Sequence, residues 1–213
     1  MKTDDLITML ASGAGAVEPG ALRRRYAAAL GWGAFGTTLL MALLLGVRAD
    51  LAEAAWLPMF WVKLAFPAAL FAGALLAALR LSRPGVRLGR VPAALAAPVL
   101  AMWLLGTAVL LGAAPAERAD LMLGFSWISC PFTIALLSVP LFGAAFWAMQ
   151  GMAPTQPALA GGASGLLAGA GGALVYALYC PEMAAPFIAI WYLLGMLIPA
   201  ALGALLGRRL LRW

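Results

Sequence analysis

The stretch of sequence that decides the fold is WLPMFWVKLAFPAALFAGALLAAL, which covers residues 56–79. Lys63 is its one charged residue. A helix needs about 20 apolar residues to cross roughly 30 Å of hydrocarbon, so this stretch is long enough to span a membrane.

Five further apolar stretches of similar length occur in the chain. They cover residues 26–47, 91–113, 121–149, 158–179 and 185–207. The stretch 121–149 is long enough to tilt, or to break near Pro131 or Pro140. Because the connections are short, we expect an all-α integral membrane protein, a six-transmembrane-helix bundle over residues 26–213. Residues 1–25 form a short cytoplasmic segment, with a glycine-rich hinge over 11–20.

The composition supports a membrane protein and argues against an enzyme. Of 213 residues, 65% are hydrophobic and 10% are charged, whereas a soluble domain carries roughly 25% charged residues. The chain has no histidine, which excludes Ser-His-Asp triads and most zinc sites. Its two cysteines do not form a Cys-x-x-Cys pair, so a thioredoxin-like redox motif is absent.

The charged residues are sorted by side of the membrane. With the N-terminus inside, the outer loops hold two basic residues, Arg48 and Arg118. The inner segments hold eleven: Lys2, Arg23, Arg24, Arg25, Arg80, Arg83, Arg87, Arg90, Arg208, Arg209 and Arg212. This positive-inside pattern predicts that both termini are cytoplasmic. The net charge of +6 is therefore an orientation signal and does not indicate direct binding to nucleic acid.

Lys63 allows two interpretations, because a lysine inside a membrane costs free energy unless its charge is accommodated. The side chain can extend outward so that its ammonium reaches the interface. Alternatively, it lies inside the bundle and is paired with a carboxylate or a backbone carbonyl. Pro67, four residues later, favours the second interpretation, since proline cannot donate a hydrogen bond to the carbonyl of Lys63.

The two cysteines are each followed by proline, as Cys130-Pro131 and Cys180-Pro181. On the predicted topology they lie with Lys63 and Glu182 in the outer layer of the bundle. Proline bends the chain away from helix, so we expect the thiols in an irregular, partly wet pocket. They could bind a soft metal ion, form a disulfide or serve only as packing residues.

Gly161, Gly165 and Gly169 repeat every four residues within the stretch 158–179. Small residues at this spacing let helices approach closely. We expect tight packing within the chain, and a homodimer through this glycine-rich helix is the alternative.

The first residues of the chain have the pattern of a short amphipathic helix. Asp4 and Asp5 suit the first turn of a helix, and Leu6, Ile7 and Leu10 form an apolar stripe. Because so short a helix is marginally stable in water, it needs a partner. The acidic residues disfavour anionic lipid, so a cytoplasmic protein with a hydrophobic groove is the better candidate.

Four segments in this order resemble the NrsF family of six-span bacterial membrane proteins. They are Met-Lys-Thr-Asp-Asp-Leu-Ile at residues 1–7, Phe60-Trp61-Val62-Lys63-Leu64, Ser126-Trp127 followed by Cys130-Pro131, and Cys180-Pro181-Glu182-Met183. The resemblance implies an anti-sigma factor that holds an extracytoplasmic-function sigma factor inactive at the bacterial inner membrane. It also implies that the N-terminal segment contacts the sigma factor, and that Cys130 and Cys180 sense heavy metals or oxidants.

These observations give one leading hypothesis and one alternative. In the leading hypothesis the N-terminal segment sequesters the sigma factor until the outer layer senses a signal. Its partner-binding residues are Lys2, Asp4, Asp5, Leu6, Ile7 and Leu10, and its sensing residues are Cys130, Cys180, Lys63 and Glu182. No resident cofactor is expected beyond a transient soft metal ion at the two thiols. The alternative is the six-span substrate-binding subunit of a small-molecule transporter, which should line a cavity with several polar groups.

Overall fold

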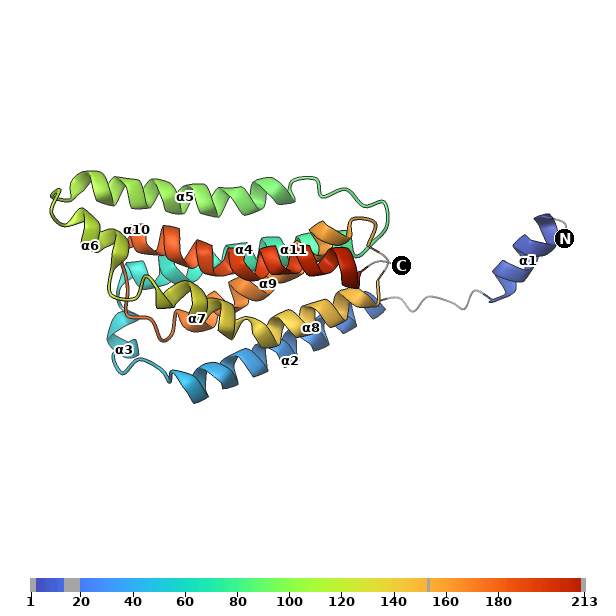
Figure 1. Cartoon of the computed structure of the whole chain (residues 1–213), viewed down its shortest axis with the longest axis horizontal. Coiled ribbons are helices and arrows are strands. Elements are labelled where there is room, and N and C mark those ends of the chain that lie inside the picture. The colour runs from blue at the N-terminus through green and yellow to red at the C-terminus, as the bar shows by residue number, and fades with distance from the viewer. Residues whose placement is uncertain (1–2, 14–19, 153, 212–213) are drawn as a thin grey trace.

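The computed structural model describes residues 3–13, 20–152 and 154–211, and every regular element in this part of the chain is helical. The long helices are α2 (Ala21–Leu44), α4 (Pro58–Leu81), α5 (Val91–Gly112), α9 (Pro157–Tyr176) and α11 (Leu193–Leu210). The shorter ones are α1 (Thr3–Gly13), α3 (Leu51–Ala54), α6 (Arg118–Leu123), α7 (Ser129–Leu137), α8 (Val139–Gln150) and α10 (Ala185–Phe187). A π-helical turn, η1 (Ile188–Tyr192), joins α10 to α11. Figure 1 shows the long helices side by side in one bundle.

Among the described residues, five helical segments are long and apolar enough to cross a membrane. They are α2, α4, α5, α9 and the continuous run Ala185–Leu210. A sixth span arises if α7 and α8, which meet at a bend of 45°, count as one. The all-helical membrane fold is therefore confirmed, with five or six spans.

The predicted stretch 121–149 starts too early. Its first residues belong to α6, and the membrane-length segment begins at Ser129. Of the predicted alternatives, a tilt or a break near Pro131 or Pro140, the break near Pro140 is present: α7 ends at Leu137 and Pro140 lies in the first turn of α8. Pro131 lies in the first turn of α7. A first-turn proline breaks no helical hydrogen bond, which explains why Pro131 does not interrupt the helix.

Helix α9 is the most buried of the spans, and α11 packs along it. The glycines predicted to pack closely do so: a Cβ added at Gly161 or Gly165 would run into the backbone of Gly203 or Pro199 of α11. Packing within the chain is therefore confirmed. The alternative of a homodimer through this glycine-rich helix stays a prediction, and α11 covers the face that carries Gly161 and Gly165.

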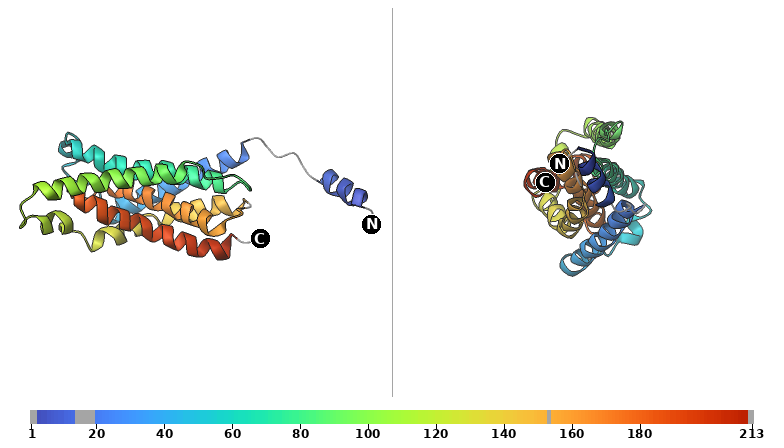
Figure 2. Two further views of the ribbon diagram at one scale, coloured as in Figure 1. Left: turned by 90° about the horizontal axis from the view of Figure 1, so that it is seen from above. Right: turned by 90° about the vertical axis from the view of Figure 1, so that its right-hand side faces the viewer.

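Helix α5 lies at the edge of the bundle, where Figures 1 and 2 show it beside α4 and α10. Only Val91, Met102 and Gly106 of this helix are buried. Apart from Thr107, whose hydroxyl donates to the carbonyl of Trp103, the rest of its surface is apolar, as expected for a helix that faces lipid.

The bundle has two chemically different ends (Figure 1). We call one the thiol end; it holds α3, α6 and the segment Cys180–Ala184. We call the other the arginine end; it holds the start of α2, the loops after α4 and α8, and the end of α11. The arginines predicted to be inside, as far as they are described, gather at the arginine end.

Helix α1 begins at Thr3, with Asp4 and Asp5 in its first turn, as predicted. The predicted hinge begins as the last residues of this helix, Ala11–Gly13, and its residues 14–19 lie outside the described residues. Figure 1 shows α1 away from the bundle.

Candidate functional site

The segment Cys180-Pro181-Glu182, which follows α9, is held by a buried lysine. Lys63 Nζ donates hydrogen bonds to the backbone carbonyls of Cys180, at 2.6 Å, and of Glu182, at 2.8 Å. The Lys63 side chain is 0% exposed. The interpretation that its ammonium extends out to the interface is therefore wrong, and pairing with backbone carbonyls is confirmed. Lys63 thus fixes the main chain on both sides of Pro181.

Arg48, in the loop between α2 and α3, supports the same segment from outside. Its backbone N–H donates to Leu178 O at 3.3 Å, and its Nη1 donates to Cys180 O at 3.4 Å. The guanidinium also forms a two-pronged ion pair with Asp50, at 2.7 and 2.5 Å. This pair holds the pKa of the Asp50 carboxyl below its usual value and raises the pKa of Arg48. Cys180 O therefore accepts hydrogen bonds from two cationic side chains.

The Glu182 side chain does not join the thiols, although the sequence predicts that it lies near them. Its Oε1 accepts a hydrogen bond of 2.8 Å from the backbone N–H of Phe125, in the loop before α7. The neighbouring Gly124 has φ +54°, and a Cβ there would lie 2.7 Å from Glu182 Oε1. Glycine is therefore required at position 124, both by conformation and by the close approach of the carboxylate. Through this contact Glu182 ties the Cys180 segment to the loop that leads into Cys130.

The two cysteines are free thiols in one buried cluster, which also contains Tyr176 and Tyr192. Both cysteines are 0% exposed, so the expected partly wet pocket is wrong. Cys130 lies inside α7 rather than at a break, and the two tyrosines help to close the space around the thiols. The Tyr192 ring centroid lies 5.8 Å from that of Tyr176 and 5.5 Å from Lys63 Nζ. The Tyr192 hydroxyl is buried and has no hydrogen-bond partner in the described part of the chain.

The donor set does not suit a tetrahedral metal site. Within residues 3–13, 20–152 and 154–211, no three His, Cys, Asp or Glu side chains come close enough to hold a metal ion together. Structural zinc needs four ligands and catalytic zinc three protein ligands. The two thiols alone suit at most a soft ion of low coordination number. The carboxylate of Glu182, the one other candidate ligand among the predicted sensing residues, accepts a hydrogen bond from the backbone N–H of Phe125.

Sequence reasoning missed three side chains at this site: Arg48, Tyr176 and Tyr192. Tyr176 precedes Cys180 by one helical turn, a spacing that places the two on the same face. Arg48 is one of the two basic residues on the predicted outer side, which was a usable signal. No comparable signal in the sequence connects Tyr192 with the thiols.

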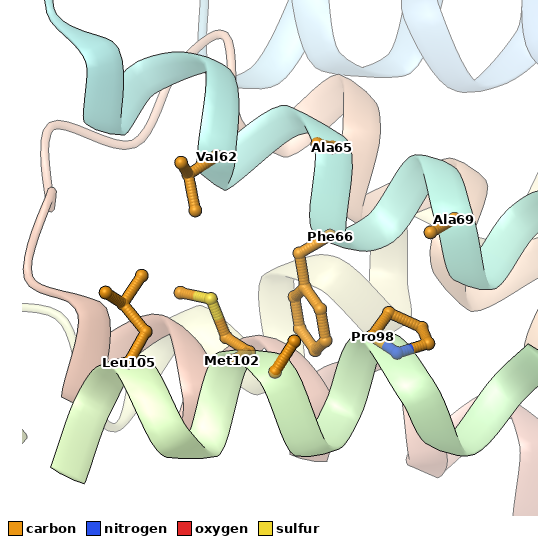
Figure 3. A pocket seen from close by; sticks show the side chains of 8 residues that line it. Val62, Ala65, Phe66, Ala69, Pro98, Met102 and Leu105 are labelled. Carbon is orange, nitrogen blue, oxygen red and sulfur yellow. The ribbon is translucent and has the colours of Figure 1, made fainter. Parts of the chain in front are cut away.

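A pocket of about 310 Å³ lies between α4 and α5, and Figure 3 shows its lining. The lining residues are Val62, Ala65, Phe66, Ala69, Pro98, Ala101, Met102 and Leu105. All of these side chains are apolar, whereas a substrate site needs a few polar groups to orient its ligand. This pocket therefore does not favour the transporter alternative.

The predicted partner-binding residues lie on α1 where they are described. Leu6, Ile7 and Met9 are 40%, 58% and 62% exposed. Asp4 and Asp5 are also exposed. Leu10 belongs to the same helix, and Lys2 lies outside the described residues. The helix therefore presents apolar side chains that no described part of the bundle covers.

Apolar spans, a lysine-held loop beside two buried thiols, and an exposed N-terminal helix define a polytopic helical membrane protein. The chain belongs to the NrsF family, described as negative regulator of sigma F, whose model matches residues 10–213. This confirms the resemblance seen in the sequence.

Two curated relatives align over the full length of both chains. One, from Azospira oryzae, is 61% identical and is named probable anti-sigma-F factor NrsF. The other, from Caulobacter vibrioides, is 41% identical and is named anti-sigma-F factor NrsF. These names are those of regulators, not of enzymes. No solved structure matches the chain.

Proposed function

We propose that this protein is a membrane-bound anti-sigma factor that sequesters a sigma factor through its N-terminal segment. Full-length similarity to two proteins named as anti-sigma-F factors supports the class. The observation that carries the mechanism is the exposed apolar surface of α1. We further propose that the partner is an extracytoplasmic-function sigma factor.

The binding mode that suits α1 is a helix in a hydrophobic groove. An isolated helix of 11 residues is marginally stable in water, so binding would both cover its apolar stripe and stabilise its fold. Leu6, Ile7 and Leu10 would enter the groove, and Asp4 and Asp5 would meet basic residues at its rim. Lys2, at the start of the chain, would add an ionic contact in which this chain carries the positive charge.

The proposed orientation places the arginine end and both termini in the cytoplasm of a bacterium, with the bundle in the inner membrane. The segregation of arginines supports it. In this arrangement α7 and α8 together form one broken span, which completes six. The thiol end then faces the periplasm, where heavy metals and oxidants arrive first.

We propose that Cys130 and Cys180 are the sensing residues and that Lys63 and Glu182 hold the segment that responds. A soft divalent cation would displace the two thiol protons and bind both thiolates. Alternatively, a hydroperoxide would accept two electrons, and the thiols would form a disulfide and release two protons, which yield an alcohol and water with the reduced peroxide. Either product requires the two sulfur atoms to come together, on a shared metal ion or in a disulfide bond.

A contact between α8 and the start of α2 supports transmission from the thiols to the N-terminal segment. Cys130 lies in α7, and α8 follows after the bend. At the end of α8, Trp147 O accepts a hydrogen bond of 2.7 Å from Arg25 Nη2, and the Arg25 guanidinium lies 4.4 Å from the Trp147 ring centroid. Arg25 is in the first turns of α2, close in sequence to α1. A shift of α7 and α8 would therefore move Arg25, the last residue of the N-terminal segment.

Co-purification of the tagged full-length protein from its native membranes tests the proposed role. Mass spectrometry should identify a sigma factor in the eluate, and Leu6→Asp with Ile7→Asp should remove it. Ser12→Asp adds a charge on another face of the same helix and should leave the complex intact. Retention of the sigma factor by the double variant, or a bound metabolite in place of a sigma factor, would contradict the proposal.

A further inference from the structure

A second pocket, with a polar lining, lies at the arginine end between the α4–α5 loop and the α8–α9 loop. It has a volume of about 290 Å³. Its lining residues are Leu81, Arg83, Gly85, Val86, Arg87, Leu88, Thr155 and Gln156. Unlike the pocket between α4 and α5, it combines two guanidinium groups with neutral polar side chains and a few apolar ones. It is separate from the thiol end and from α1.

The loop that carries the two arginines is braced by its own hydrogen bonds. Arg80 Nη1 donates to Leu88 O at 2.5 Å, and Val86 N–H donates to Arg83 O at 3.5 Å across the turn. Gly85, at φ +78°, allows the turn between Arg83 and Arg87. The two guanidinium groups are therefore presented from a loop with a defined backbone.

The opposite wall adds further positive potential. Thr155 and Gln156 precede Pro157, the first residue of α9, and no side-chain cap is bonded to the start of this helix. The first turn of a helix has unpaired N–H groups and carries a partial positive charge. Both walls of the pocket thus favour an anion.

The charge of the pocket is not balanced within the described residues. Their one ion pair joins Arg48 and Asp50, at the other end of the bundle. Apart from Asp4 and Asp5 of α1, the described acidic residues are at the thiol end: Asp50, Glu53, Glu117, Asp120 and Glu182. Arg83 and Arg87 are exposed and face no carboxylate in this part of the structure.

The level at which the pocket lies in the membrane favours a lipid phosphate over a soluble anion. Helix α4 has 24 residues, so it is about 36 Å long and exceeds the hydrocarbon core of about 30 Å. Its last residue, Leu81, lines the pocket, which places the pocket where the span reaches the headgroups. Leu81, Val86 and Leu88 provide an apolar border next to the arginines. Arginine also matches the geometry of phosphate oxygens, to which it donates two parallel hydrogen bonds.

We propose that this pocket binds the phosphate group of an anionic phospholipid at the membrane surface. The guanidinium groups of Arg83 and Arg87 hold the phosphate oxygens, and Thr155 and Gln156 donate to the remaining polar atoms of the headgroup. The site does not depend on the sigma factor, and it fixes the two loops relative to the membrane plane.

Native mass spectrometry of the delipidated full-length protein tests the proposal, with phosphatidylglycerol and phosphatidylcholine as probes. The wild type should bind phosphatidylglycerol in preference to phosphatidylcholine. Arg83→Gln with Arg87→Gln should weaken phosphatidylglycerol binding by roughly tenfold to thirtyfold, because the phosphate loses its charge-assisted hydrogen bonds to two guanidinium groups. Arg208→Gln with Arg209→Gln removes the same charge from the same end outside the pocket and should change binding by less than about twofold.

Three results would overturn the proposal. Equal losses in the two double variants would show a nonspecific charge effect. Displacement of phosphatidylglycerol by inorganic phosphate at low millimolar concentration would assign the site to a soluble anion. Unchanged lipid binding with weaker sigma-factor capture by the Arg83 and Arg87 variant would assign the arginines to a protein contact. If glutamine substitutions prevent insertion, Arg83→Lys with Arg87→Lys preserves the orientation signal and should weaken binding less, because the paired donor geometry is lost while the charge remains.

Discussion

Lys63 and Cys180 are 117 residues apart in the chain, and the ammonium of the first donates a hydrogen bond of 2.6 Å to the backbone carbonyl of the second. The lysine is fully buried and is held by carbonyl groups rather than by a carboxylate. A side chain on the span α4 thus holds the backbone beside a thiol in the segment between α9 and α10.

Substitution of Lys63 by methionine should loosen the Cys180 segment. Two carbonyls would lose a charged donor, while the cost of burying an ammonium would disappear, so global stability need not fall. We expect the alkylation rate of Cys180 to rise about tenfold, as for a loss of about 1.4 kcal/mol in local stability. Mass spectrometry after iodoacetamide treatment measures this rate. Val62→Met, at the exposed neighbouring position, is the control, and equal rates in the two variants would contradict the assigned role.

Replacement of both cysteines by alanine should abolish the response to cadmium or peroxide without releasing the sigma factor. Each substitution removes one buried sulfur and should cost about 1 kcal/mol of stability, which leaves the bundle folded. A sigma-dependent reporter, measured with and without the inducer, checks the outcome. A reporter that still responds in the double variant would show that the sensor lies elsewhere.

Gly124→Ala should lower the thermal stability of the protein more than Gly46→Ala does. Both glycines have positive φ, at +54° and +74°, so each substitution should cost about 1–2 kcal/mol for the backbone conformation. Only at position 124 does the new Cβ also meet the Glu182 carboxylate, whereas nothing lies within 4 Å at Gly46. Thermal unfolding of the two purified variants measures the difference. Equal melting temperatures would mean that the contact between Glu182 and the α6–α7 loop is unimportant.

Gly165→Ala and Gly162→Ala form a matched pair on α9. At Gly165 the added Cβ would strike the backbone of Pro199, which cannot move without shifting α11. At Gly162 the nearest atom would be 3.5 Å away, an ordinary contact. We expect Gly165→Ala to lower stability by about 1–3 kcal/mol and Gly162→Ala to have little effect. Urea or detergent unfolding of the two variants gives the comparison, and a reversed order would disprove the packing between α9 and α11.

Acid should weaken the loop held by Arg48 and Asp50. The ion pair lowers the pKa of the Asp50 carboxyl, so its contribution is complete above the unfolded pKa, near 3.9, and is lost as the pH falls through the lower folded pKa. Hydrogen exchange at residues 48–50 is measured in the wild type and in an Asp50→Asn variant at each pH. The wild type should be better protected than the variant at pH 6, and the two should become equal in strong acid. Equal protection of the wild type and the Asp50→Asn variant at pH 6, where the ion pair is fully formed, would contradict this account.

The gathering of the arginines at one end of the bundle was predictable from the sequence because basic residues are counted over the whole chain. The spans were predictable because each apolar stretch is a local property. The glycine packing between α9 and α11 was predictable for the same reason, since Gly161, Gly165 and Gly169 follow the helix period. The bend between α7 and α8 was only partly predictable. Proline marked its neighbourhood, but the helix ends depend on what packs against them, such as Gly172 of α9, which lies against Ser138.

The chemistry of the thiol end was less predictable. Burial of both cysteines results from tyrosines on α9 and η1 that are far from Cys130 in sequence. The partners of Lys63 are backbone carbonyls, which every residue has and no sequence pattern distinguishes. Glu182 was placed in the correct neighbourhood, but the direction of its side chain depends on the conformation of Gly124.

The complete burial of Cys130 and Cys180 has a kinetic consequence. A reagent can reach a sulfur atom only while the surrounding segment is transiently open, so the reaction rate rises with reagent concentration only until it equals the rate of opening. Above that concentration the protein reacts at a speed set by its own fluctuations. Brief or weak exposure would then leave most molecules unmodified, and the fraction converted would report the duration of the stress more than its intensity.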